Sequence, residues 1–118
     1  MKSSLETYKG QTIFIARYDH MSLDELRVEV EEVKKYMAEN MANRDILVLV
    51  DTNGTLVSPE VLSLFKEISS KSSQYRTKTA ILGMTGPRRI FLDIVSKFSK
   101  VNVMPFDDAD KAKEWLIQ

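Results

Sequence analysis

The segment RDILVLVD, residues 44–51, constrains the fold more than any other part of the chain, because it places an unbroken aliphatic run between charged residues. Such a run is too short for a buried helix and is typical of a parallel strand that is covered on both faces. We therefore predict a central strand that ends near Asp51. Ile46 to Val50 are expected to be inaccessible to solvent on both faces of the sheet.

Strand and helix patterns also precede this segment. Residues 11–18, QTIFIARY, are rich in β-branched and aromatic residues and predict an earlier strand. In residues 21–41, Ser22 and Glu25 have the spacing of a capping box, and apolar residues recur at helical intervals. Those apolar residues are Leu26, Val30, Val33, Met37 and Met41. This second segment predicts a long amphipathic helix.

After the central strand, Ser58 and Pro59 are typical of a helix N-cap and a first helical residue. The apolar side of that helix is formed by Val61, Leu64, Phe65 and Ile68. Residues 77–86, TKTAILGMTG, predict a third strand, and Gly86-Pro87 predicts the start of another helix. The apolar residues of this helix are Ile90, Phe91, Ile94, Val95 and Phe98.

The alternation repeats once more at the end of the chain. Residues 100–106, KVNVMPF, predict an edge strand with one wet face, and Asp107 or Asp108 is expected to cap a last helix. Ala109, Ala112, Trp115 and Leu116 would hold that helix on the sheet. Strand-helix units in this order predict an α/β fold with four repeating units, right-handed crossovers and a mostly parallel sheet covered by helices.

Length and composition limit what this fold can do. The chain of 118 residues fits one domain, residues 1–118, in which residues 1–7 form a tail or a short added edge strand. Seventeen basic residues balance seventeen acidic ones, which gives no general attraction to nucleic acid. The absence of cysteine and the single histidine exclude thiol catalysis and a histidine metal cluster within one chain. The sequence also predicts no membrane span and no signal peptide, and so a cytoplasmic location.

Several segments together resemble a known family. They are YKGQTIFIARYD, LVLVDTNG before SPEVL, TAILGMTGPRRIF and FDDADKAKEWL. With these segments the chain resembles the small bacterial STAS/CRAL-TRIO-type, or SpoIIAA-like, proteins from Tyr8 to Leu116. The resemblance implies a right-handed β/α superhelix of four units. Most stand-alone bacterial members have no assigned activity, whereas better-studied STAS relatives are protein-binding switches.

Some of those switches are phosphorylated on a serine at the start of the second helix, within an Asp-Ser-Ser-Gly-like sequence. This chain reads LVSPEVL there, so Ser58 is the hydroxyl closest to the helix start. A helix N-terminus favours a phosphate through its free amides and its dipole. Serine before Pro-Glu is equally an ordinary N-cap, and we favour that interpretation of Ser58.

Polar residues gather where the predicted strands end, which is where α/β sheets bind ligands. They are Asp19, His20, Asp51, Thr52, Asn53, Thr85 and Asp107. Asp51 and Thr85 match two features of a phosphate-accepting receiver domain, but Met104 replaces the lysine expected before Pro105. We therefore interpret Asp51 as a turn residue and His20 as a surface loop residue, with Asp19 and Asn53 in the same polar cluster. The sequence predicts no catalytic residue, cofactor or metal.

The segment GMTGPRR, residues 83–89, contains two further candidate binding residues. Arg88 and Arg89 fall in a first helical turn, where cations oppose the helix dipole. Together with Ser58, Thr85 and Gly86 they form a candidate surface for an anion or an acidic partner. The alternative, which we favour, is a salt bridge to the acidic first helix.

We expect a non-enzymatic STAS-like module that binds a protein partner through one surface around its strand-exit loops and the second or third helix. A carrier or sensor of a small apolar or lipid-like ligand is the alternative, suggested by the CRAL-TRIO side of the resemblance. A receiver-like domain that accepts a phosphoryl group at Asp51 is a third hypothesis. The sequence leaves a homo-oligomer open.

Overall fold

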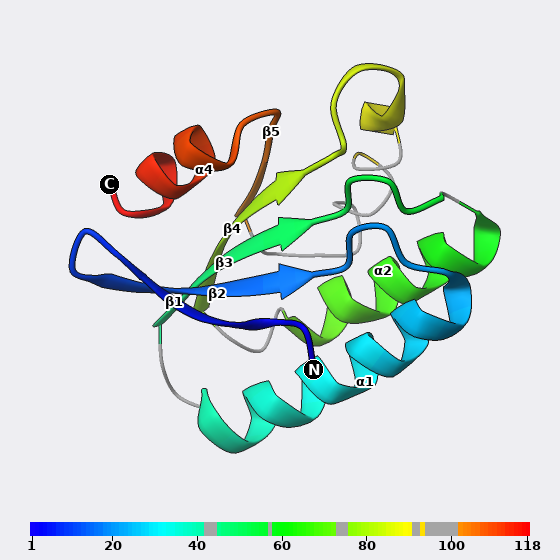
Figure 1. The fold of residues 1–118 in the computed structure, drawn as a ribbon, viewed down its shortest axis with the longest axis horizontal. Coiled ribbons are helices and arrows are strands. Elements are labelled where there is room, and N and C mark those ends of the chain that lie inside the picture. The colour runs from blue at the N-terminus through cyan, green and yellow to red at the C-terminus, as the bar shows by residue number, and fades with distance from the viewer. Residues whose placement is uncertain (42–44, 57, 73–75, 91–92, 94–101) are drawn as a thin grey trace.

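The computed structural model describes residues 1–41, 45–56, 58–72, 76–90, 93 and 102–118. These residues form a five-stranded sheet with helices on both of its faces (Figure 1). The strands are β1 (Ser4–Tyr8), β2 (Gln11–Arg17), β3 (Asp45–Asp51), β4 (Arg76–Leu82) and β5 (Asn102–Phe106). The helices are α1 (Leu23–Asn40), α2 (Pro59–Ser72), the short 3-10 helix η1 (Gly86–Arg88) and α4 (Ala109–Leu116).

The sheet confirms the predicted α/β class. Its strand order is β1-β2-β3-β4-β5, and β2 to β5 are parallel, so each expected strand lies beside the next one in the sequence. β1 is antiparallel to β2 and joined to it by a turn at Lys9 and Gly10, which have φ angles of 47° and 83°. The N-terminal residues are therefore an edge strand rather than a tail. An edge strand was one of the two alternatives drawn from the sequence, but the turn that pairs this strand with β2 was not predicted.

Side chains of alternate residues fill two separate cores. Phe14 and Ala16 of β2 point to the face covered by α1 and α2, whereas Ile13 and Ile15 belong to the core under α4. Figure 1 shows α1 and α2 on one side of the sheet and α4 on the other. The helix α4 has only eight residues, so it covers less of its face than the two long helices cover of theirs.

The central strand was predicted correctly, but not its complete burial. β3 lies third of five, and Ile46, Val48 and Leu49 are buried. Leu47 and Val50 are only half-buried, which corrects the expectation that all five residues are inaccessible. Leu47 faces the side covered by the short α4. Val50 is the last residue but one of the strand and packs against the core under α1 and α2.

The predicted first helix is confirmed in its start, its cap and its buried side. Ser22 accepts a hydrogen bond from the backbone N–H of Glu25, and the Glu25 side chain accepts one from the Ser22 N–H, so the capping box is complete. The apolar residues expected to face the sheet are all buried: Leu26, Val30, Val33, Met37 and Met41. The capping box and the regular helical spacing of apolar residues were therefore sufficient to predict this helix from nearby residues alone.

Later helices follow their predicted caps with some differences in burial. Ser58 caps α2, and Asp108 rather than Asp107 caps α4 by accepting from two backbone N–H groups. In α4 Ala112 and Leu116 are buried, Trp115 is half-buried and Ala109 is exposed. Ile90 is helical and 61% exposed. Phe91, Ile94, Val95 and Phe98 lie outside the described residues.

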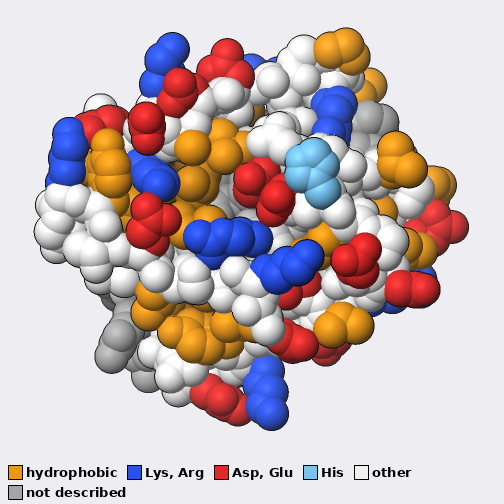
Figure 2. Space-filling model, viewed as in Figure 1, with side chains coloured by type: hydrophobic (Ala, Val, Ile, Leu, Met, Phe, Trp, Pro, Cys, Tyr) orange, Lys and Arg blue, Asp and Glu red, His pale blue; other side chains and the backbone are white. Residues whose placement is uncertain are grey.

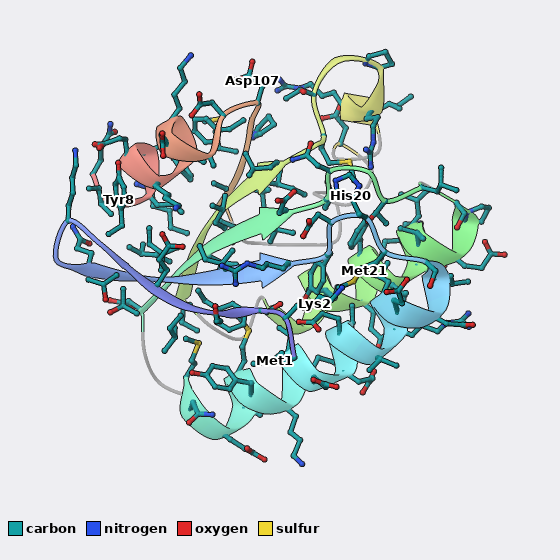
Figure 3. The ribbon with its side chains drawn as sticks, in the orientation of Figure 1. Met1, Lys2, Tyr8, His20, Met21 and Asp107 are labelled. Atoms are coloured by element: carbon teal, nitrogen blue, oxygen red, sulfur yellow. The ribbon has the colours of Figure 1, made fainter. Side chains whose placement is uncertain are left out.

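A buried carboxylate that the sequence did not reveal holds the N-terminal segment on α1. Glu29 accepts hydrogen bonds from the N–H groups of Lys2 and Ser3, at 3.0 and 2.8 Å, and from the Ser3 hydroxyl at 2.6 Å. Burial alone would raise the pKa of Glu29, but these hydrogen bonds outweigh it and hold the pKa below its usual value. Figure 3 shows Met1 and Lys2 beside α1, and the Met1 amino group lies 2.9 Å from Glu32.

In the described part of the chain, we find no helix with the length and apolar character needed to cross a bilayer.

Candidate functional site

The loop after β3 is built by its own side chains. Asp51 Oδ1 accepts hydrogen bonds from the Asn53 backbone N–H at 3.0 Å and from Asn53 Nδ2 at 2.9 Å. Gly54 then takes a φ angle of 74°, which glycine adopts without strain. These are the contacts of an Asx turn. The interpretation of Asp51 and Asn53 as turn residues is thus confirmed in geometry.

Buried threonine hydroxyls join this loop to both neighbouring strands. Thr52 Oγ1 donates to the Leu82 carbonyl at the end of β4, at 2.5 Å. Thr55 Oγ1 donates to the Tyr18 carbonyl after β2 and accepts from the Met21 N–H at 3.1 Å. The strand-exit loops are therefore cross-linked by groups that are already satisfied. Thr55 was missed in the sequence, because nothing local shows that its hydroxyl reaches a residue 37 positions away.

His20 lies on the surface, as the sequence predicted, at the turn that follows Asp19. It has a φ angle of 50°, and its N–H donates to the Asn53 carbonyl at 2.8 Å. Its ring lies directly over Gly54, where a Cβ atom would stand 2.0 Å from His20 Nδ1. Figure 2 shows the histidine at the surface with acidic side chains next to it, and Figure 3 shows His20 beyond the end of the sheet. Gly54 therefore provides the space that the imidazole occupies.

The contacts of the Arg88 side chain differ from both hypotheses drawn from the sequence, which were a surface for an anion or acidic partner and a salt bridge to α1. Its Nη2 donates to the Thr55 carbonyl at 3.0 Å and lies 3.5 Å from the Thr52 carbonyl, so the side chain points back over the loop after β3. It neither extends freely into solvent nor pairs with the acids of α1 in the described residues. The physical reason is that the ends of neighbouring parallel strands bring these carbonyls within reach of a long guanidinium side chain. Arg88 Nε is buried, and no hydrogen-bond partner for it is found among the described residues.

The other residues of the candidate anion or partner surface are exposed or half-buried. Arg89, Thr85 and Gly86 are exposed, and the Thr85 side chain does not cap η1. Ser58 is half-buried at the start of α2, and its hydroxyl accepts from the Val61 N–H at 3.2 Å. The favoured N-cap interpretation of Ser58 is thus confirmed. Its phosphorylation stays a hypothesis.

The structure adds two exposed apolar residues to this surface. Leu56 is 84% exposed and follows Thr55, while Ile90 is 61% exposed and lies two residues after Arg88. Because Arg88 bonds the Thr55 carbonyl, it holds the segments that carry both side chains next to each other. We call Leu56, Arg89 and Ile90 the exit surface. Within the described residues, no group of three acidic or histidine side chains could hold a metal ion.

No family model matches the chain, and no curated protein sequence matches it. Among solved structures, the chain is similar to an uncharacterised protein of the DUF3478 family with a SpoIIAA-like fold from Shewanella loihica PV-4. The TM-score is 0.65, the sequence identity is 16%, and the match covers 97% of this chain and 91% of that chain. Together with the strand order, this similarity shows that the chain has a SpoIIAA-like fold, as the sequence resemblance implied.

Proposed function

We propose that this protein is a non-enzymatic, STAS-like regulatory module that binds a protein partner through the exit surface. The observation that carries the proposal is the exposure of Leu56 and Ile90 on either side of the Arg88 contact. An isolated exposed apolar residue is common, but large exposed side chains on two segments that are held together favour an interaction site. The proposal includes a cytoplasmic location.

Charge indicates what kind of partner would suit this surface. Arg89 is exposed and directly precedes Ile90 in the sequence, and an exposed guanidinium beside an apolar side chain favours an acidic group on the partner. The polar side chains behind it support binding over chemistry, because Asp51, Thr52 and Thr55 are engaged in hydrogen bonds within the loops. They give the surface a rigid base, which lowers the entropy lost on binding.

The experiment is affinity capture followed by mass spectrometry with four matched variants. Leu56→Gln and Arg89→Gln alter the exit surface, while Met104→Gln and Lys111→Gln also replace an apolar and a basic side chain with glutamine, at exposed residues of β5 and α4. A partner bound at the exit surface should be retained by both controls. Its affinity for each site variant should fall about tenfold or more, as for central residues of an interface. Thermal melts verify that all four variants remain folded.

The same captured proteins with equal affinity for all four variants would contradict the proposal. Separate incubation with acetyl phosphate and magnesium addresses the hypothesis of a phosphoryl group on Asp51. Mass spectrometry of the intact chain then detects any phosphorylated product, and a labelled Asp51 would replace the binding proposal with a receiver-like one.

A further inference from the structure

The two edges of the sheet differ in how they are protected. β5, at one edge, contains Pro105, which has no N–H group and is a common guard against pairing with another strand. β1, at the other edge, has the sequence SLETY without proline. Within the described residues it pairs with β2 alone. The open edge of β1 is therefore the place where the sheet could continue.

The register of the hairpin identifies the backbone groups at this edge. Tyr8 and Gln11 flank the turn at Lys9 and Gly10, and such flanking residues share a pair of hydrogen bonds. Because bonded pairs alternate along an antiparallel ladder, Glu6 and Ser4 also bond inward to β2. Leu5 and Thr7 consequently direct their N–H and C=O groups outward.

The row of outward groups ends at Ser3. Its N–H, which would be next in the alternation, donates to Glu29 at 2.8 Å and is unavailable to another strand. The unused groups thus form one short set on Leu5 and Thr7, centred on Glu6. A strand that pairs with this set must align with it in one register.

Side chains on the α1 side of this edge are exposed. Leu5 is 45% exposed and pairs with Phe14, which places it on the face covered by α1. Thr7 is exposed on the same face. A second copy that continues the sheet would cover the apolar Leu5 side chain.

The opposite face has balanced charges. Glu6 lies 2.8 Å from Lys113 of α4, and Glu114 of the same helix accepts from the Tyr8 hydroxyl at 2.6 Å and pairs with Lys9. Two identical carboxylates placed opposite each other would normally repel. Here Lys113 accompanies each Glu6, so a second copy brings two neutralised pairs together.

We infer that β1 is a homodimerisation edge, and that it pairs antiparallel with β1 of a second copy about a two-fold axis at Glu6. In this register Leu5 of one chain lies opposite Thr7 of the other, and the two residues exchange both of their backbone hydrogen bonds. The two sheets become one continuous sheet, with Leu5 and Thr7 of each copy at the junction. The inference does not use the exit surface and is independent of the proposed function.

Sedimentation equilibrium over a series from about 1 µM to about 1 mM tests the inference. We expect the mass to rise toward twice the 13.5 kDa of one chain. Thr7→Pro removes an outward N–H without touching the bonds to β2, and Leu5→Lys places a charge at the junction. Each variant should weaken dimerisation about tenfold or more. Thr7→Ser, which keeps the N–H, and Leu56→Lys, which changes an exposed leucine elsewhere, should leave it unchanged.

Amide hydrogen exchange checks the register on the unmodified chain. Protection of the Leu5 and Thr7 amides should increase with protein concentration, whereas the Glu6 amide, already bonded to β2, should change little. A mass of one chain throughout the series would overturn the inference. So would a dimer that tolerates both Thr7→Pro and Leu5→Lys as folded proteins, because its interface would then lie elsewhere.

Discussion

At the scale of single residues, the arginines of GMTGPRR illustrate how side-chain direction depends on the fold. The sequence places Arg88 and Arg89 side by side and gives them one role. In the structure Arg88 binds the carbonyls of the loop after β3, and Arg89 is exposed. Residues 33 and 36 positions apart in the sequence make these contacts, so no local pattern could have separated the two arginines.

The two arginines should therefore differ in their effect on stability. Arg88→Gln removes a charged donor from the Thr52 and Thr55 carbonyls and should lower the free energy of unfolding by about 1–3 kcal/mol. Arg89→Gln changes an exposed side chain and should stay within about 0.5 kcal/mol of the unmodified protein. Urea unfolding of both variants measures the difference. Equal losses would show that the Arg88 contacts contribute little.

At the scale of elements, local chemistry predicted most of the fold. The capping box at Ser22 starts α1, and the aliphatic run within residues 44–51 forms β3, because each signal acts within a few neighbouring residues. A short edge strand at residues 1–7 was one of the two alternatives drawn from the sequence, but the turn at Lys9-Gly10 that pairs it with β2 was not predicted. Burial of Glu29 could not be predicted, because its partners are 26 and 27 residues away.

The contact between Glu29 and the N-terminal segment should make stability depend on pH. The pKa of Glu29 is below its unfolded value of 4.5, so the carboxylate stabilises the fold above pH 4.5. That contribution is lost as the pH falls below 4.5 and through the folded pKa. At neutral pH, Glu29→Gln should lower the free energy of unfolding by about 1–3 kcal/mol. The difference from the unmodified protein should shrink in acid.

Chemical denaturation at neutral pH and at several acidic values measures this dependence. Glu39→Gln is the matched control, because Glu39 is an exposed glutamate on the same helix. It should alter stability little at any of these pH values. A Glu29→Gln difference that stays constant through the acid range would argue against a carboxylate that titrates below its usual pKa.

At the scale of the whole molecule, two cores share one sheet, and their coverage is unequal. The core under α1 and α2 contains Phe14, Val48 and Phe65, whereas the other core depends on the eight-residue α4. Helical periodicity predicted several residues of both cores, such as Val30 and Leu116, but Ala109 and Ile90, which it also placed on apolar sides, are exposed. The sequence could not show which face of the sheet each helix covers, because this depends on the direction in which the chain leaves the preceding strand.

The central strand should set the stability of the entire domain. Val48 is 6% exposed in the core under α1 and α2, so Val48→Asp would bury a carboxylate without a partner. The cost is several kcal/mol, a large part of the roughly 5–15 kcal/mol that holds a domain together. We expect Val48→Asp to abolish cooperative thermal unfolding measured by circular dichroism. Val28→Asp makes the same change at a valine that is 59% exposed, and it should melt near the temperature of the unmodified chain. Retained cooperative melting of Val48→Asp would mean that the central strand is less enclosed than its contacts indicate.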